Sequence, residues 1–462
     1  MASSSSSPDW SSQADGTFTR PLDTLETFFK LLADGGAPIN REHWAITVAL
    51  RLKHAWLMLA QLHPNLTGTA QPDNSSTKQV LTVSPLDAKW WIAETFILHD
   101  DIPDSKALFA SLRPSPTARC HWLPTSKELC IPSSHWRIDG IGMLMLANSF
   151  LKILTATLHG SNFDSDGQGP LTPSLDPIVS SYTCEETTPL YLRSAADAMV
   201  ADFVRGVPSI ALPTTLGSQS NVPGPTEREA FSFDVGTTQA IVSACKERGL
   251  SVPSAAHAAI VRVTAAYPQH PLAKSYAAFF PTDLRRHLPD PWNKNNFAVG
   301  MFCSGLPATV TDVIGKSFDD IANVLNEVYR RDLAQVCTDD DGNPVGMLHL
   351  TAPYIRRTTK LFNTPPPPEL PPVENPDLSS FGKIEQYLQH EYIYEQGDKG
   401  RVIVDDFWIG TETLARSLQC HVWTFRDQLT IQGCFNISFY DSSFVSEVLQ
   451  KVKDELVEGL GL

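Results

Sequence analysis

The sequence lacks the short motifs that identify several large enzyme classes. It contains no G-x-S-x-G pattern, with which α/β-hydrolases present a nucleophilic serine. No glycine-rich loop of the P-loop or dinucleotide-binding type is present. Its eight cysteines include no C-x-x-C pair, and its histidines and cysteines form no cluster with the spacing of a zinc site. We therefore expect no metal, no nucleotide cofactor and no serine-hydrolase chemistry.

The sequence also lacks an excess of basic residues. Lys and Arg together number 36 against 51 Asp and Glu, which gives a formal net charge of −15 without long blocks of one sign. DNA, RNA and anionic membranes attract proteins that carry a basic face. We expect none of them to be a partner, whereas a few local Arg or Lys residues would still suffice to bind an anionic small molecule.

No export signal is recognisable at the N-terminus. The opening MASSSSSPDWSSQADG is rich in serine and has neither a basic start nor an apolar core, so we interpret residues 1–16 as a disordered tail. The most apolar stretch, residues 141–158, contains Asn148 and Lys152 and is interpreted as a buried helix rather than a membrane span. We expect a cytoplasmic monomer with reduced thiols, including Cys120 and Cys130 in a predicted hairpin.

What the sequence does contain indicates two domains of mixed α/β class. A chain of 462 residues with 42% hydrophobic and 19% charged residues has the composition of a globular protein with more than one core. Helix-like and strand-like patterns alternate in both halves, and a stretch rich in Pro, Gly, Ser and Thr separates them. We predict an N-terminal domain at 17–206, a linker at 207–229 and a C-terminal domain at 230–462.

Individual elements follow from hydrophobic periodicity. The pattern predicts a first helix ending at a Gly-Gly pair, one long helix over residues 42–62, a hairpin at 118–132 and a helix at 141–158. The second half begins with a strand and two capped helices and ends with strands and an amphipathic helix. The proline-rich tract TPPPPELPPVENP is interpreted as a stiff connector, with an SH3 or WW ligand as the alternative.

One short segment, SSHWRIDGIG, carries a candidate site. It places His135 and Asp139 between a predicted strand and an apolar helix. A histidine displayed at such a turn can accept a proton from an alcohol or amine, because its pKa lies near neutral pH. Asp139 would fix the loop by pairing with a distant Arg, and Gly140 would let the backbone pass closely. The competing interpretation is structural: His135 caps a helix or fills a polar gap.

This segment resembles the HxxxDG motif of the chloramphenicol acetyltransferase-like superfamily, which includes BAHD acyltransferases, condensation domains of peptide synthetases and fungal trichothecene O-acetyltransferases. Condensation domains usually carry two adjacent histidines, whereas the first place here is Ser134. The stretch FFPTDLRRHLPDPW resembles the superfamily's Asp-x-Arg region, with Arg285 at the arginine. VDDFWIG resembles the BAHD DFGWG motif imperfectly, with Trp408 at the first glycine. The whole chain looks most like the trichothecene 15-O-acetyltransferase group.

The resemblance implies two chloramphenicol acetyltransferase-like domains with an active-site tunnel at their interface. It also implies transfer of an acyl group, in particular acetyl, from acyl-CoA as co-substrate to a hydroxyl of a hydrophobic secondary metabolite. His135 would be the general base, within a catalytic set that includes Asp139 and Gly140. Four further residues carry supporting roles: Arg285 pairing with Asp139, Asp406 organising a loop, and Arg286 and Trp408 as weaker candidates for contacts with CoA or substrate.

Three other functions remain open at this point. A cyclase or isomerase of the pericyclase type can use the same fold, and so can a condensation enzyme that takes its acyl group from a carrier protein. A binding protein with a decayed site is the third, although the His, Asp, Gly and Arg set is intact. A covalent acyl-cysteine needs an activated thiolate, and we expect Cys130 and Cys303 to be inert thiols in apolar strands.

Overall fold

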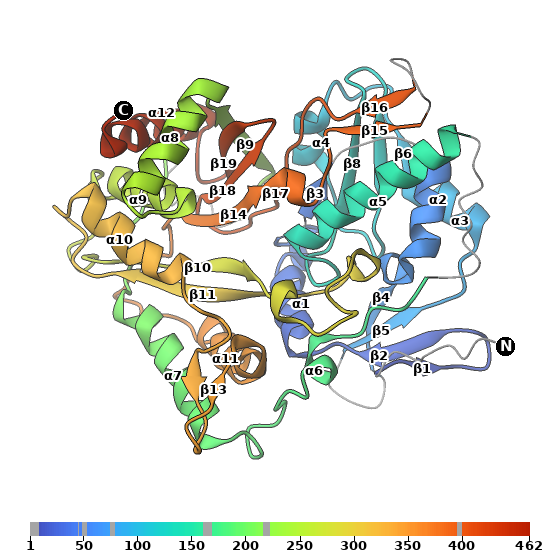
Figure 1. The fold of residues 1–462 in the computed structure, drawn as a ribbon, viewed down its shortest axis with the longest axis horizontal. Helices are drawn as coiled ribbons and strands as arrows, with labels where there is room; N and C mark the ends of the chain where they lie inside the picture. The colour runs from blue at the N-terminus through green and yellow to red at the C-terminus, as the bar shows by residue number, and fades with distance from the viewer. Residues whose placement is uncertain are drawn as a thin grey trace. The chain divides into compact units, whose positions relative to one another are not determined.

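The computed structural model describes residues 9–44, 46–48, 53–73, 79–159, 169–215, 222–394 and 400–462. The chain divides into two compact units (Figure 1). Unit 1 comprises Met1–Thr183, Asp283–Cys303 and Glu385–Thr411, and unit 2 comprises Cys184–Thr282, Ser304–Ile384 and Glu412–Leu462. Both mix helices and strands, as predicted, but the boundaries differ from a simple division into halves, because two segments of the second half belong to unit 1. The predicted interface tunnel stays a prediction.

Unit 1 contains two larger sheets and a hairpin. One sheet has the order β1-β2-β5-β4 and is antiparallel throughout. The other has the order β17-β3-β8-β7-β6, in which only β6 and β7 run parallel. The bounds are β1 Ser11–Ser12, β2 Phe18–Pro21, β3 Ile46–Val48, β4 Thr69–Pro72, β5 Gln79–Val83, β6 Phe96–Leu98, β7 Cys120–Leu123, β8 Glu128–Ser133, β15 Glu391–Ile393, β16 Arg401–Ile403 and β17 Gly410–Thr411.

The strand β17 explains why part of the second half folds with unit 1. Gly410 and Thr411 pair with Thr47 and Ile46 of β3, at the edge of the five-stranded sheet. The helices of unit 1 are α1 Thr24–Asp34, α2 Lys53–Leu62, α3 Ala88–Thr95, α4 Ser105–Ser111, α5 Gly140–Leu158 and α6 Leu175–Ile178, with short 3-10 turns at Ala37–Ile39, Pro64–Thr67, Arg285–His287 and Asn295–Phe297.

Helix α5 is the central helix of unit 1 and packs against α2 and β3 (Figure 1). Among the described residues it is the one helix long and apolar enough to cross a membrane by length and composition, and 72% of its apolar window is buried inside the protein. That test is weak evidence for a membrane span, since core helices pass it too. Burial of residues such as Leu144, Phe150 and Ile153 agrees with the predicted core helix.

The prediction of one long helix over residues 42–62 is wrong. Its N-terminal part contains the strand β3, and the described helix α2 begins at Lys53, while residues 45 and 49–52 lie outside the described residues. The physical reason is that Ile46, Thr47 and Val48 include the β-branched residues that favour strands. These three residues find partners in β8, where they pair with Ser133, Pro132 and Ile131.

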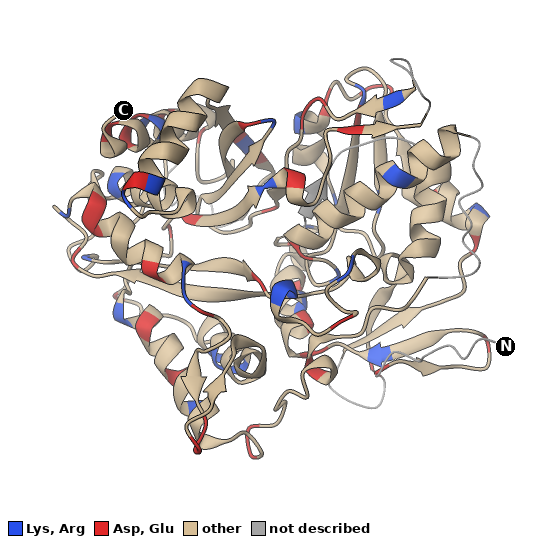
Figure 2. Cartoon of the chain, viewed as in Figure 1, with Lys and Arg blue, Asp and Glu red and all other residues tan. Residues whose placement is uncertain are grey.

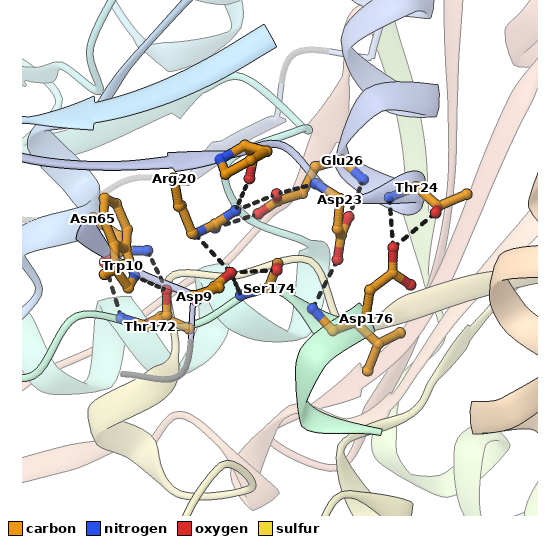
Figure 3. A network of polar contacts seen from close by, with 12 residues as sticks. Asp9, Trp10, Arg20, Asp23, Thr24, Glu26, Asn65, Thr172, Ser174 and Asp176 are labelled. Atoms are coloured by element: carbon orange, nitrogen blue, oxygen red, sulfur yellow. Dashed lines mark hydrogen bonds and ion pairs between the residues drawn. The ribbon is translucent and has the colours of Figure 1, made fainter. Parts of the chain in front are cut away.

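The described end of the expected N-terminal tail is held in place rather than disordered. Trp10 donates its indole N–H to the carbonyl of Thr172 at 3.1 Å, and Asp9 accepts hydrogen bonds from the backbone and side chain of Ser174 (Figure 3). Asp9 also lies 3.6 Å from the guanidinium of Arg20. Residues 1–8 of the expected tail lie outside the described residues.

Unit 2 is built on the sheet β14-β18-β19-β9, in which β14 runs parallel to β18 and the other pairs are antiparallel. Helices α8, α9 and α12 pack against this sheet, and α7 packs against α11 (Figure 1). The strand bounds are β9 Thr226–Ser232, β10 Tyr276–Asp283, β11 Cys303–Val310, β12 Cys337–Thr338, β13 Pro344–Val345, β14 Asp377–Lys383, β18 Gln419–Phe425 and β19 Gln428–Asn436. The helices are α7 Leu190–Arg205, α8 Val235–Glu247, α9 Val252–Ala265, α10 Phe318–Tyr329, α11 Met347–Phe362 and α12 Ser442–Leu460.

The segment predicted as a linker, 207–229, is part of unit 2 wherever it is described. Its last residues, from Thr226, belong to β9 and pair with β19, and Ile210 and Leu212 are buried. Residues 216–221 lie outside the described residues. The proline-rich tract at 364–376 forms no regular element before β14 begins, in agreement with a connector.

Candidate active site

The candidate site lies at the turn between the end of β8 and the start of α5. The strand ends at Ser133, a turn closes with the Arg137 N–H donating to the Ser134 carbonyl at 3.0 Å, and α5 begins at Gly140. Asp139 is the N-cap of α5, since its Oδ1 accepts the N–H of Gly142 at 2.8 Å. A side-chain oxygen at this position satisfies one of the free N–H groups of the first helical turn. The turn between the two elements displays His135.

Asp139 also forms the expected ion pair with Arg285, which is thereby confirmed. The Arg285 Nη1 donates to Oδ1 and Oδ2 of Asp139 at 2.7 and 2.8 Å, and the backbone N–H of Phe302 donates to Oδ2 at 2.8 Å. Both charged side chains are almost completely buried. The Asp139 carboxylate is therefore committed to structural hydrogen bonds, so its described role is to hold the turn.

A second carboxylate shares the arginine. Asp283 accepts from Arg285 Nη1 at 3.1 Å, and burial raises the pKa of Asp283 while the guanidinium opposes that shift. Burial by itself would lower the pKa of Arg285, but the two carboxylates hold that pKa above its ordinary value. The arginine thus stays charged between two acids, as a buried ion pair requires.

The structure shows that Gly142 allows a close backbone approach. A Cβ added at Gly142 would lie 2.3 Å from the Ala298 carbonyl oxygen and 3.0 Å from Nη2 of Arg285. The close approach expected at Gly140 stays a prediction. Gly140 itself is the first residue of α5. The DGIG pattern contains both glycines, and the sequence alone did not indicate the close approach at Gly142.

His135 lies among aromatic rings. The Phe29 ring of α1 stacks on its imidazole with centroids 4.2 Å apart and planes inclined by 12°, and the Trp44 ring lies at 6.3 Å, tilted by 51°. Nδ1 of His135 is buried and has no hydrogen-bond partner among the described residues. The residue as a whole is only half-buried, which leaves Nε2 as the nitrogen for solvent or substrate.

Desolvation dominates the protonation state of His135. Burial lowers its pKa to about 4, and a contact with its own backbone and the Asp139 carboxylate act in the opposite direction to a smaller extent. The imidazole is therefore neutral at pH 7. A neutral imidazole has a free lone pair, which is the state that a general base needs before it accepts a proton.

The segment from Arg41 to Trp44 also lies beside the His135 turn, and the sequence did not predict this. Ser134 donates its hydroxyl to Oε2 of Glu42 at 3.0 Å. Burial lowers the pKa of His43 to about 4, with a further decrease from neighbouring His135. Trp44 adopts a positive φ of 63°, which is uncommon for a bulky residue and marks local strain. No sequence motif predicts these contacts, because they join segments about ninety residues apart in the chain.

Two residues inside the motif are structural. Arg137 donates to the carbonyls of Gly68 at 2.9 Å and Pro116 at 2.7 Å, and its guanidinium lies 4.5 Å from the centroid of the Trp136 ring. Trp136 is buried. Burial lowers the pKa of Arg137 to about 10, with Glu42 acting in the opposite direction. Both side chains therefore tie loops together beneath the His135 turn.

The weaker candidates lie in different surroundings. Trp408 is buried, donates its indole N–H to the Ser105 hydroxyl at 2.8 Å and packs edge-on against Phe109. Asp406 is exposed and accepts the backbone N–H of the next residue, Phe407, at 2.8 Å, in an irregular segment. Arg286 is exposed, next to the buried Arg285. The structure gives Trp408 a packing role and Asp406 a loop role, while Arg286 stays a candidate for anion contact.

No group of three or more His, Cys, Asp or Glu side chains is placed to hold a metal ion, as far as the described residues extend. All eight cysteines are free thiols, which confirms the expectation for Cys120 and Cys130. Burial raises the pKa of Cys303 well above its ordinary value, and the Asp139 carboxylate adds to this shift. Such a thiol stays protonated and is a poor nucleophile.

The chain is similar in sequence to known fungal proteins. No protein-family model matches the chain. It is 29% identical to "Loline biosynthesis cluster 1 transcription factor lolU1" of Epichloe uncinata, over 98% of this chain and 97% of that protein. It is 28% identical to "Acetyltransferase pigO" of Monascus ruber, over 98% of both chains. The similarity therefore spans essentially the whole length of both proteins.

Among solved structures, the trichothecene 15-O-acetyltransferase TRI3 of Fusarium sporotrichioides superimposes with a TM-score of 0.78. The match covers 100% of both chains at 17% sequence identity. A likeness at this identity establishes the fold. The predicted α/β fold of the chloramphenicol acetyltransferase-like kind is thereby confirmed.

Proposed function

We propose that this chain is an O-acyltransferase of secondary metabolism, which moves an acyl group, in particular acetyl, from acyl-CoA to a hydroxyl of a hydrophobic acceptor. The observation that carries the proposal is the His135 turn: a neutral, partly buried histidine near an aspartate that a buried arginine fixes in place. Similarity along nearly the full chain to a protein named acetyltransferase, pigO, supports the same reaction class.

His135 acts as the general base of this reaction. Its Nε2 takes the proton of the acceptor hydroxyl while the oxygen forms a bond to the thioester carbonyl carbon, whose carbonyl becomes an oxyanion. Collapse of the tetrahedral intermediate restores the carbonyl and breaks the C–S bond. The imidazolium then returns its proton to the sulfur of CoA. A positioned base of this kind contributes roughly 10²- to 10⁴-fold to the rate.

Asp139 is a positioning residue in this scheme. Its two oxygens accept four hydrogen bonds, from Arg285 twice, from Gly142 and from Phe302. A carboxylate engaged in this way has no capacity left to relay a proton. Its contribution is to keep the turn rigid, so that the base meets the hydroxyl in one orientation.

Direct transfer between the two substrates fits the thiols better than a covalent acyl-enzyme. Burial keeps the Cys303 thiol protonated, and the hydroxyl of Ser134, the residue before His135, donates to Glu42 rather than to the imidazole. We therefore propose a ternary complex of enzyme, acyl-CoA and acceptor.

A role in DNA binding, which the name of the relative lolU1 raises, fits this chain less well. DNA binding draws its affinity from Lys and Arg contacts to phosphates, whereas this chain has a formal charge of −15. Figure 2 shows Lys and Arg interspersed with acidic residues in both units. A cytoplasmic monomer without nucleic-acid or membrane partners remains part of the proposal.

The test is incubation of the pure protein with acetyl-CoA and a panel of terpenoid and polyketide alcohols, following free CoA and product mass. The proposal predicts acceptor-dependent release of CoA and a product heavier by one acetyl group. If CoA thioesters are neither bound nor consumed while a polyene substrate is isomerised without a change of mass, the protein is a cyclase. If acyl groups are accepted only from a carrier protein, it is a condensation enzyme.

A further inference from the structure

The proposed reaction assigns no role to the ring of Phe29, which stacks on His135. Phe29 lies on α1, 106 residues before the histidine, yet its ring lies parallel to the imidazole at 4.2 Å between centroids. Phe29 is itself 8% exposed. The two planes differ by only 12°, so one face of the imidazole is covered by an apolar surface and water is excluded from it.

The stack compensates for a missing hydrogen bond. In many enzymes a carboxylate or carbonyl accepts the second ring N–H of the catalytic histidine and thereby sets the orientation of the ring. Here Nδ1 of His135 has no hydrogen-bond partner among the described residues, and both oxygens of Asp139 are engaged elsewhere. Among the described residues, no hydrogen bond to another residue fixes the imidazole plane, so packing has that role.

The helix that carries Phe29 is anchored at its start. Asp23 and Glu26 form a reciprocal capping box, and Glu26 accepts two hydrogen bonds of 2.6 Å from Arg20 (Figure 3). Asp23 also accepts the N–H of Leu175 at 2.7 Å. Caps and charge-assisted pairs of this kind hold the first turn of a helix rigidly. Phe29 lies on the next turn of α1, so the anchored backbone of the helix fixes the position of its ring.

A second ring supports the arrangement from another side. Trp44 lies 5.6 Å from Phe29 and 6.3 Å from His135, between ring centroids, and its positive φ places a bulky residue in an uncommon backbone conformation. Backbone strain of this type persists where the surrounding structure requires it, and it gathers at functional sites. The imidazole is thus held by two aromatic residues from separate segments.

We propose that Phe29 is a positioning residue for His135: its stacked ring fixes the imidazole plane and so aims Nε2 at the acceptor hydroxyl. The proposal rests on the proposed acyl transfer for its kinetic part only. His135 interacts electrostatically with two titratable groups: Asp139 raises its pKa, and His135 in turn lowers the pKa of His43. Substitution of Phe29 leaves both groups in place.

Replacement of Phe29 by leucine, which keeps an apolar side chain but removes the ring, is the first test. With acetyl-CoA and an accepted alcohol, kcat of Phe29→Leu is expected to fall about 10- to 100-fold, since small misplacements of a catalytic group have effects of this size. KM is expected to change less than kcat. Phe29→Tyr keeps the ring and is expected to restore kcat close to the wild-type value.

Phe109→Leu is the matched control, because it removes another buried ring of unit 1 that packs against Trp408 instead. It is expected to keep kcat. If Phe29→Leu does not fold, as judged by circular dichroism, Phe29→Met replaces it. The proposal is overturned if the folded ring-less variant keeps wild-type kcat, or if Phe109→Leu loses as much activity as Phe29→Leu.

An NMR titration of the histidine ring protons separates this proposal from the acyltransferase proposal, because it needs no turnover. The His135 signal is assigned by its absence from His135→Ala. Wild-type His135 is expected to stay neutral from pH 8 to pH 5, whereas in Phe29→Leu water reaches the ring and the signal titrates within that range. An unchanged signal in Phe29→Leu contradicts the positioning role, and a wild type without acyl transfer contradicts only the proposed reaction.

Discussion

Two histidines, His135 in unit 1 and His257 in unit 2, show that burial alone does not identify an active site. Burial lowers the pKa of His135 to about 4 and that of His257 to about 3, so both are neutral at pH 7. Their hydrogen bonds differ. His257 is fully buried and contacts Tyr276 Oη at 2.6 Å through Nε2 and Tyr329 Oη at 3.1 Å through Nδ1.

The direction of the bonds around His257 follows from its neighbours. The Tyr276 hydroxyl donates its proton to the Pro376 carbonyl at 2.9 Å, so it accepts from His257 and Nε2 carries the proton. Nδ1 then accepts the hydroxyl proton of Tyr329. Every polar atom of the ring is satisfied, and nothing remains for a substrate. His135, by contrast, is half-exposed with an unpartnered nitrogen. A lowered pKa indicates function only where hydrogen-bonding capacity is left unused.

The largest expected effect on stability comes from substitution of Asp139, which holds the turn that carries His135. Asp139→Asn removes one charge of the buried pair with Arg285, and breaking such a pair typically costs about 3–5 kcal/mol in the free energy of unfolding. We expect a value at the lower end, because Asp283 still neutralises the arginine. Urea denaturation measures the loss.

Asp234→Asn is the matched control, since Asp234 caps α8 in an exposed position. Asparagine caps helices about as well as aspartate, so this variant is expected to keep the wild-type unfolding curve. If Asp139→Asn is as stable as the wild type but loses activity selectively, the aspartate takes part in the chemistry and the positioning role is wrong.

His257→Phe is expected to have a smaller effect, and on stability alone. It leaves the partly buried Tyr329 hydroxyl without its contact to His257, while Tyr276 keeps Pro376. An unsatisfied buried hydroxyl costs about 1–3 kcal/mol. Urea denaturation of His257→Phe, Tyr329→Phe and the double variant measures the coupling, which is expected to be clearly non-additive. Additive losses would mean that the contact contributes little.

The smallest expected effect is the contribution of His257 alone to the pH dependence of stability. The pKa of His257 is about 3 in the folded protein against an ordinary value of 6.5, so the unfolded chain binds the proton more readily as the pH falls below 6.5. Stability is therefore lost on acidification between pH 6.5 and about 3, by at most about 1.4 kcal/mol per pH unit for one histidine.

Unfolding free energies at pH 7 and pH 5 check this expectation. Several other buried histidines have lowered pKa values, among them His63 and His421 at about 4, so the wild type is expected to lose stability steeply. His257→Phe is expected to lose less over the same interval, by the contribution of one proton. Equal losses in the two proteins would show that His257 is already free to titrate in the folded state.

The sequence sufficed for the parts of the site that local patterns encode. The strand, turn and apolar helix around His135 follow from hydrophobic periodicity, and the motif resemblance located Arg285 as the partner of Asp139 across 146 residues. The close approach at Gly142 could not be predicted, because it depends on the Ala298 carbonyl, which only the folded backbone brings near.

Other parts of the fold and of the site could not be predicted from local sequence patterns. Phe29 belongs to an ordinary amphipathic helix, and nothing in its spacing indicates which ring will reach His135. The strand β3 was missed because Ile46–Val48 is too short to be distinguished from the start of a helix, until β8 and β17 supply its partners. Trp408 looked like a motif residue, yet its contact with Ser105 and Phe109 gives it a packing role. Each of these depends on tertiary contacts between distant segments.

The most direct test of the account is to compare kcat for acetyl transfer in the wild type, His135→Ala and His257→Phe, with an alcohol that the wild type accepts. The account predicts a fall of roughly 10²- to 10⁴-fold for His135→Ala with an unchanged circular dichroism spectrum, and wild-type kcat for the folded fraction of His257→Phe. A folded His135→Ala variant that keeps wild-type kcat would contradict the assignment of His135 as the base.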